Sequence, residues 1–141
     1  MGASLTLNRI KGQQKREHNK FLHDIYIELR KNSNLLDGHG NILNTDIWDS
    51  GISSGSILSI DSKELEELSE TYHQIETNTY EAEICRQAGE HYRSLPGSLA
   101  KDQALINWNG LSLLLRKREP ILRKEIGDFL DEDFWEKAGV D

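Results

Sequence analysis

Glu70 and His73 come nearest to a chemical motif, since carboxylate-bridged di-iron bundles carry such an E-x-x-H pair on a helix. Around a helix whose buried face centres on Tyr72, Glu70 lies about 200° and His73 about 100° from that centre. A di-iron site also needs a second pair, and Ala88 stands three residues before His91, where a Glu is required. We therefore predict no metal site and no cofactor.

Other catalytic patterns are missing from the sequence. It contains no Gly-rich phosphate loop, no G-x-S-x-G elbow, and no cysteine and histidine in a plausible catalytic order. His18, His23 and His39 are scattered without ligand spacing, and we expect them to face solvent. Cys85 is the sole cysteine, so no internal disulfide can form, and we expect a small buried apolar residue there. We predict no catalytic residues and no enzyme activity.

The composition fits one folded helical domain. The chain has 141 residues, of which 36% are apolar and 29% charged, with only two prolines. A domain of this size needs no metal or disulfide to complete its core. No run of about 18 apolar residues occurs, and the start of the chain lacks the apolar segment of a signal peptide. We expect a cytoplasmic protein, with a membrane-proximal position as a further option.

Basic residues form clusters although the net charge of the chain is −7. We interpret these clusters as helix faces that are solvated or paired with acidic faces. The alternative is that the first cluster contacts an anionic membrane surface. Nucleic acid is the weaker option, because the whole chain is acidic and carries no recognisable binding motif. The first cluster consists of Arg9, Lys11, Lys15, Arg16 and Lys20.

The first long helix is predicted to begin near Gln13 and to end before Asp37. Residues 1–12 show no hydrophobic period, so we predict a flexible arm there and a single helical domain over residues 13–141. The apolar residues of this helix share one stripe. They are Leu22, Ile25, Tyr26, Leu29 and Leu36.

A short helix is predicted between the first two long helices. Thr45 is the expected N-cap, and Asp46 lies in the first turn, where the helix dipole favours a carboxylate. The helix should carry Trp48 inward and end by Gly51, with a turn over residues 52–57. We interpret Trp48 as a core residue between helices rather than a platform for a ligand.

The second long helix is predicted to run from Ser62 to about Ser94. Asp61 and Glu64 have capping-box spacing at its start, and Pro96 prevents its continuation. Its buried seam alternates spacings of three and four residues through Leu65, Leu68, Tyr72, Ile75, Thr79 and Ala82. The seam continues with smaller residues that form a candidate interface: Cys85, Ala88 and Gly89, followed by Tyr92.

A third long helix is predicted after Ser98, and a short last helix from about Phe129 to Lys137. Pro120 either kinks the third helix or starts a new one, and the sequence leaves both open. The core-facing residues should be Leu105, Trp108, Leu111, Leu115, Leu122 and Ile126, with Leu113 and Leu114 widening that face. A second candidate interface consists of Phe129, Phe134 and Trp135.

Residues 22 to 80 resemble an uncharacterised group of bacterial and archaeal helical modules. The first two parts of the pattern match Glu28, Leu29, Arg30, Asn32, Asn34, Leu35 and Leu36, then Thr45, Asp46, Trp48, Ser50, Ile52, Ser54, Gly55 and Ile57. The third matches Leu65, Leu68, Ser69, Tyr72, Ile75, Glu76 and Asn78. The resemblance implies a helical module that often adjoins membrane-spanning helices, and no established activity. The chain departs from the pattern at Ile47, where Ala is frequent, and no membrane-spanning segment precedes the module.

We expect an all-α fold, an up-down bundle of three main helices with a short helix at Trp48 and a short C-terminal helix. The leading hypothesis is a non-catalytic interaction or assembly module. Its protein partner would be another copy or a different chain, and it would act near the cytoplasmic membrane face. The alternative is a small ligand-binding domain or enzyme with a pocket between the second and third long helices, near Tyr72, Cys85 and Trp108.

Overall fold

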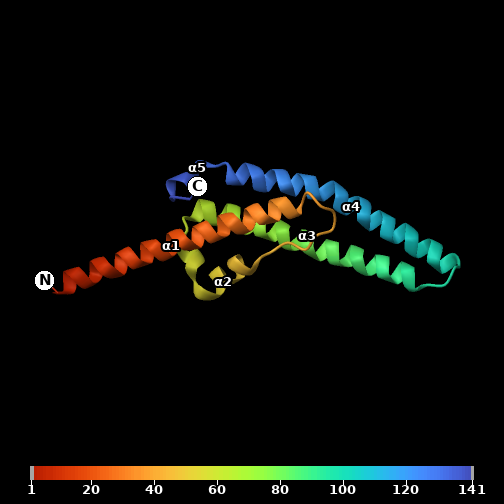
Figure 1. The fold of residues 1–141 in the computed structure, drawn as a ribbon, viewed down its shortest axis with the longest axis horizontal. Coiled ribbons are helices and arrows are strands. Elements are labelled where there is room, and N and C mark those ends of the chain that lie inside the picture. The colour runs from red at the N-terminus through yellow and green to blue at the C-terminus, as the bar shows by residue number, and fades with distance from the viewer. Residues whose placement is uncertain (1, 141) are drawn as a thin grey trace.

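The computed structural model describes the backbone of residues 2–140 and the side chains of residues 6–140. All regular secondary structure in this part of the chain is helical, which confirms the predicted all-α class. Three long helices, α1 (Gly2–Leu35), α3 (Ser62–Ser94) and α4 (Leu99–Leu130), dominate the fold (Figure 1). The shorter elements are α2 (Asp46–Ser54), the 3-10 helix η1 (Ser56–Ser59) and α5 (Asp133–Lys137).

The helices α1 and α3 run in the same direction, so the predicted up-down order is wrong for this pair (Figure 1). His18 of α1 contacts Ser59 just before α3, and Glu28, ten residues later, contacts Tyr72 in α3. The residue numbers of the contacts therefore increase together along α1 and α3, as expected for parallel helices. The reason is the connection: α2 and η1 carry the chain back to the starting end before α3 begins.

The helices α3 and α4 form an antiparallel hairpin joined by residues 95–98. Beyond the end of α1, this hairpin continues as two helices alone (Figure 1). We call residues 82–115 the arm. Its small core contains Ala82, Cys85 and Leu115, with Trp108 and Leu111 packed against them.

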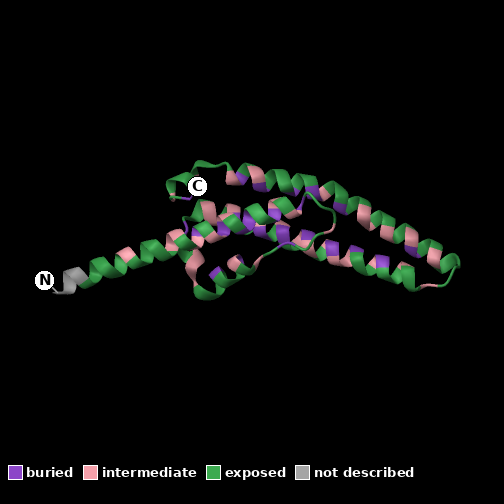
Figure 2. Cartoon of the chain, viewed as in Figure 1, coloured by how far each residue is buried: buried purple, intermediate pink, exposed green. Residues whose placement is uncertain are grey.

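The main core lies where α1, α2, α3, α4 and the C-terminal segment meet, and Figure 2 shows buried positions concentrated there. Asn78 is fully buried close to the point where the arm leaves this core, and neither polar atom of its side chain is hydrogen-bonded. The main core consists of Leu22, Ile25, Leu29, Leu36, Leu43, Trp48, Ile60, Leu68, Tyr72, Ile75, Leu122, Ile126, Phe129, Trp135 and Val140.

The start of α1 differs from the prediction of a flexible N-terminal segment over residues 1–12. The helix begins at Gly2 and runs through residues 2–12 without interruption. Side chains 6–11 are exposed, so this part of α1 gains no burial and extends the helix by propagation from the packed turns that follow. The absence of a hydrophobic period correctly indicated exposure, but it does not prevent helix formation.

The predicted end of α2 at Gly51 is wrong. Gly51 is buried inside the helix, where a Cβ atom would lie 2.5 Å from the Phe21 ring, so its role is close packing. The helix ends instead at Gly55, which has a φ of 79° and donates its N–H to the Ile52 carbonyl. The predicted turn over residues 52–57 is therefore occupied by the end of α2 and the start of η1.

The predicted side-chain caps are also absent. The Thr45 hydroxyl donates to the Asp49 carboxylate at 2.9 Å and makes no cap hydrogen bond to α2. Asp61 occupies the N-cap position of α3, yet its side chain makes no cap bond either, so the capping box with Glu64 is not formed. The start of α3 at Ser62 is as predicted.

The third long helix continues through Pro120, so this proline does not start a new helix. Phe129 belongs to the end of α4, and the last helix starts later than predicted, at Asp133. None of the helices in the described part of the chain combines the length and apolarity needed to cross a membrane.

Candidate functional site

Glu28 is a buried carboxylate that joins three segments of the main core. Its side chain accepts hydrogen bonds from the Tyr72 hydroxyl at 2.8 Å, the Ile47 N–H at 2.8 Å and the Trp48 N–H at 3.4 Å. The two backbone donors belong to the first turn of α2, whose N–H groups have no partner inside the helix. Glu28 therefore does the capping that the sequence analysis assigned to Thr45, and its negative charge suits the helix dipole.

Trp48 and Tyr72 stack on each other beside this carboxylate. Their ring centroids are 4.7 Å apart and the planes differ by 4°. Burial, and secondarily the negative charge of Glu28, raise the pKa of the Tyr72 phenol well above its ordinary value. The phenol is therefore a permanent hydrogen-bond donor near neutral pH, and both rings lie inside the core rather than in a cavity.

Asn32 extends this network by one helical turn. Its side chain donates to the Asn44 carbonyl and accepts from the Asn44 N–H, both at 2.7 Å. Glu28 and Asn32 thus fix the chain that returns from α1 to α3. In a network of this kind the polar groups are hydrogen-bonded to one another, and these bonds hold the segment in place.

Ser112, His39 and Glu119 form a second polar network with the order of a hydroxyl, imidazole and carboxylate triad. His39 Nδ1 lies 2.7 Å from Glu119 Oε1, and His39 Nε2 lies 3.1 Å from Ser112 Oγ. The buried Glu119 also accepts the Gly40 N–H at 2.9 Å. Sequence reasoning missed this network, because His39 lies more than 70 positions from both Ser112 and Glu119 and the three residues show no motif spacing.

The surroundings of Ser112 favour a structural role for this triad-like arrangement. Ser112 lies in the middle of α4, where backbone N–H groups are bonded within the helix and cannot stabilise an oxyanion. Glu119, by contrast, ties the turn after α1 to α4 through two bonds. The network therefore anchors residues 39 and 40 at the base of the arm.

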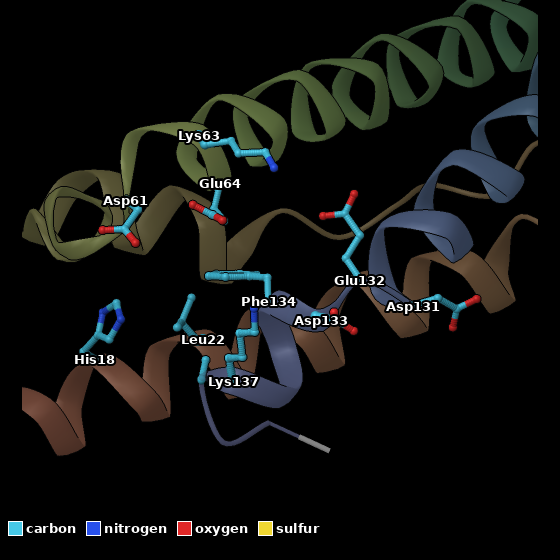
Figure 3. A pocket seen from close by; sticks show the side chains of 11 residues that line it. His18, Leu22, Asp61, Lys63, Glu64, Asp131, Glu132, Asp133, Phe134 and Lys137 are labelled. Atoms are coloured by element: carbon cyan, nitrogen blue, oxygen red, sulfur yellow. The ribbon is translucent and has the colours of Figure 1, made fainter.

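A cavity of about 680 Å³ lies between the start of α3, the middle of α1 and the α4–α5 junction (Figure 3). Figure 3 shows Lys63 and Glu132 extending toward each other across it, with Phe134 projecting into the middle. Desolvation and the neighbouring carboxylate of Glu67 raise the pKa of Glu132 above its ordinary value. The full lining is His18, Leu22, Asp61, Lys63, Glu64, Asp131, Glu132, Asp133, Phe134, Lys137 and Ala138.

The described residues contain no group of three or more histidine, cysteine or acidic side chains arranged to hold a metal ion. Glu70 and His73 are both exposed, and Glu70 accepts a hydrogen bond from Gln74 at 3.0 Å. The E-x-x-H pair thus lies on the outside of α3.

The candidate interface of the second long helix packs against α4 of the same chain. Cys85 and Gly89 are buried in the arm, and a Cβ atom at Gly89 would lie 2.8 Å from the Trp108 ring. Tyr92 packs on Trp108 with ring centroids 5.6 Å apart, and Ala88 is half-buried. These residues pack against α4 of the same chain.

The candidate interface near the C-terminus is likewise internal. Trp135 is buried and packs edge-on against Phe129 and Phe134, with centroid distances of 5.3 and 4.9 Å. Its indole N–H donates to the Phe129 carbonyl at 2.9 Å. Tyr72 lies in the main core and Cys85 and Trp108 in the small core of the arm, so the three residues of the predicted pocket belong to different clusters.

The exposed apolar surface lies elsewhere, on the side of α4 opposite its buried face. Leu113 and Leu114, predicted to face the core, are 58% and 64% exposed. At 100° per residue they share an arc of about 100° with three other large apolar residues. We call this set the outer stripe: Leu99, Ile106, Leu113, Leu114 and Ile121, all between 58% and 76% exposed.

The basic residues of the first cluster are exposed on the N-terminal half of α1: Arg9, Lys11, Lys15, Arg16 and Lys20. Figure 1 shows this half of the helix extending away from the rest of the molecule.

No protein-family model, curated protein or solved structure matches the chain.

Proposed function

We propose that this chain is a non-catalytic protein-interaction module that binds a partner helix on the outer stripe of α4. The observation that carries the proposal is that α4 has two apolar faces, of which only one is covered within the chain. Leu58 and Ile42 are exposed singly, as is normal for a protein surface, and the described N-terminal part of α1 carries only the exposed pair Leu7 and Ile10. Several exposed apolar residues along one side of a helix are instead typical of a binding surface.

The energies favour a partner that brings an apolar face of its own. Covering five mostly exposed aliphatic side chains contributes on the order of 6 kcal/mol, from about 1.5–3 kcal/mol per fully buried side chain. Association costs about 4–15 kcal/mol in lost translational and rotational freedom. The outer stripe alone barely offsets this cost. A helix with a matching apolar stripe would roughly double the gain to on the order of 12 kcal/mol, which lies in the upper part of that range of cost.

A position near an anionic membrane face is part of the same proposal. It is supported by the five exposed basic side chains on the N-terminal half of α1. Neutralising Lys15, Arg16 and Lys20 with Gln should abolish salt-sensitive flotation with phosphatidylserine vesicles. Equal flotation of this variant and the wild type would remove the membrane part of the proposal.

The proposed function is tested by photo-crosslinking in the cells that naturally produce the chain. A photoreactive amino acid at Ile106 or Leu114 should give discrete crosslinked protein species. The same amino acid at Leu58, which is more exposed but off the stripe, should not. Equal labelling at all three positions, or none at Ile106 and Leu114, would contradict an interaction surface on α4.

A further inference from the structure

We propose that the partner helix is α4 of a second copy of this chain, paired antiparallel about a two-fold axis at Gly110. The inference rests on the proposed function and names the partner of the same surface. Figure 2 shows α4 exposed along its outer side over the length of the arm, so a second copy can reach it.

The spacing of four outer-stripe residues is self-complementary in the antiparallel direction, whereas the fifth, Leu113, lies level with Asn107. When Gly110 faces Gly110, residue n of one copy lies level with residue 220 − n of the other. Leu99 then lies level with Ile121, and Ile106 with Leu114. Two-fold symmetry repeats both pairs, so four apolar contacts spread over a length of about 33 Å at 1.5 Å per residue.

Gly110 occupies the centre of the stripe, four residues from both Ile106 and Leu114. Glycine weakens a helix interior, and here nothing within the chain requires it, because a Cβ atom at this position would meet no atom within 4 Å. Gly89 differs, since the Trp108 ring packs directly on it. At the crossing point of two helices, a residue without a side chain lets the backbones approach closely.

Charge selects the antiparallel direction. Asp102 flanks one end of the stripe and Lys117 lies within the other, and both are exposed. Antiparallel pairing about Gly110 places Lys117 of one copy level with Gln103 of the other, and therefore one residue along the helix from Asp102. Parallel pairing in register would place Asp102 beside Asp102 and Lys117 beside Lys117, which like-charge repulsion disfavours.

The register is tested with single cysteines in a chain that carries Cys85→Ala, so that no other thiol is present. A disulfide needs Cα atoms within about 7 Å. Gly110→Cys should therefore form a covalent dimer rapidly under mild oxidation. Gln103→Cys and Lys117→Cys should each stay monomeric alone, since their copies would lie 14 residues or about 21 Å apart. Mixed together, these two variants should crosslink to each other.

Two results would overturn the inference. Rapid homodimers of Gln103→Cys would indicate a parallel arrangement. A Gly110→Cys chain that crosslinks no faster than Leu58→Cys, the exposed control off the stripe, would exclude pairing of two copies at this face. In the second case, photo-crosslinks at Ile106 to a different protein would still support the proposed interaction module, with that protein as its partner. The absence of these photo-crosslinks would contradict both the pairing of two copies and the proposed interaction module.

Discussion

The carboxylate of Glu28 accepts the hydroxyl of Tyr72 at 2.8 Å and at the same time caps the first turn of α2. One buried anion thus fixes α1, α2 and α3 relative to one another. The hairpin of α3 and α4 is built on this base, and the arm projects from it with the outer stripe of α4 uncovered (Figure 1). The proposed interaction depends on both features, because the base holds the hairpin and the hairpin exposes one face of α4.

Replacing Glu28 with Ala should destabilise the fold by about 2–4 kcal/mol, because it leaves the Tyr72 hydroxyl and the Ile47 N–H buried without an acceptor. Urea unfolding followed by circular dichroism measures the change. Tyr72→Phe should cost about 1 kcal/mol and the double variant less than the sum of the two. Strict additivity would show that the two residues do not interact.

Alkaline pH should destabilise the fold through Tyr72. The folded pKa is raised above the unfolded value of about 10, so the stabilisation is fully present below pH ~10 and is lost as the pH rises further. For this one group the free energy of unfolding should fall by about 1.4 kcal/mol per pH unit above 10. Urea unfolding at several pH values should show a weaker decline in Tyr72→Phe. An equal decline in both proteins would contradict the burial of the phenol.

Gly89 and Gly110, the two glycines within the helices of the arm, should respond in opposite directions to alanine. Gly89→Ala should destabilise the chain by about 1 kcal/mol net, since overpacking against Trp108 exceeds the gain in helix propensity. Gly110→Ala meets open space and should stabilise the single chain by about 0.5–1 kcal/mol. Thermal unfolding at low micromolar concentration compares them. Stabilisation by both would mean that α3 and α4 are not in close contact at Gly89.

The sequence predicted the elements better than their packing. The helix start at Ser62 and the buried positions Leu68, Tyr72, Ile75 and Ala82 of α3 follow directly from local spacing, but Asn78 is buried where Thr79 was predicted. The end of α2 was misplaced because Gly51 was interpreted as a helix terminator. It is instead a close contact with Phe21, thirty positions away, and local sequence carries no signal for such a contact.

The candidate site was the least predictable part. A carboxylate that caps a helix 19 residues downstream, as Glu28 does for Ile47, follows no capping pattern. On α4, a broad apolar face was predicted to lie entirely against the core. The helix instead divides its apolar residues between Leu115 on the inside and Leu113 and Leu114 on the outside. Which face another helix covers is a tertiary property.

The molar mass of the chain in solution tests the central claim most directly. Light scattering after size-exclusion chromatography should give twice the monomer mass of 16.1 kDa for the wild type at high concentration. Leu58→Glu should give the same dimer, whereas Ile106→Glu should give a monomer with unchanged helical content. A wild type that stays monomeric at every concentration, or an Ile106→Glu variant that still forms the dimer, would contradict pairing through the outer stripe.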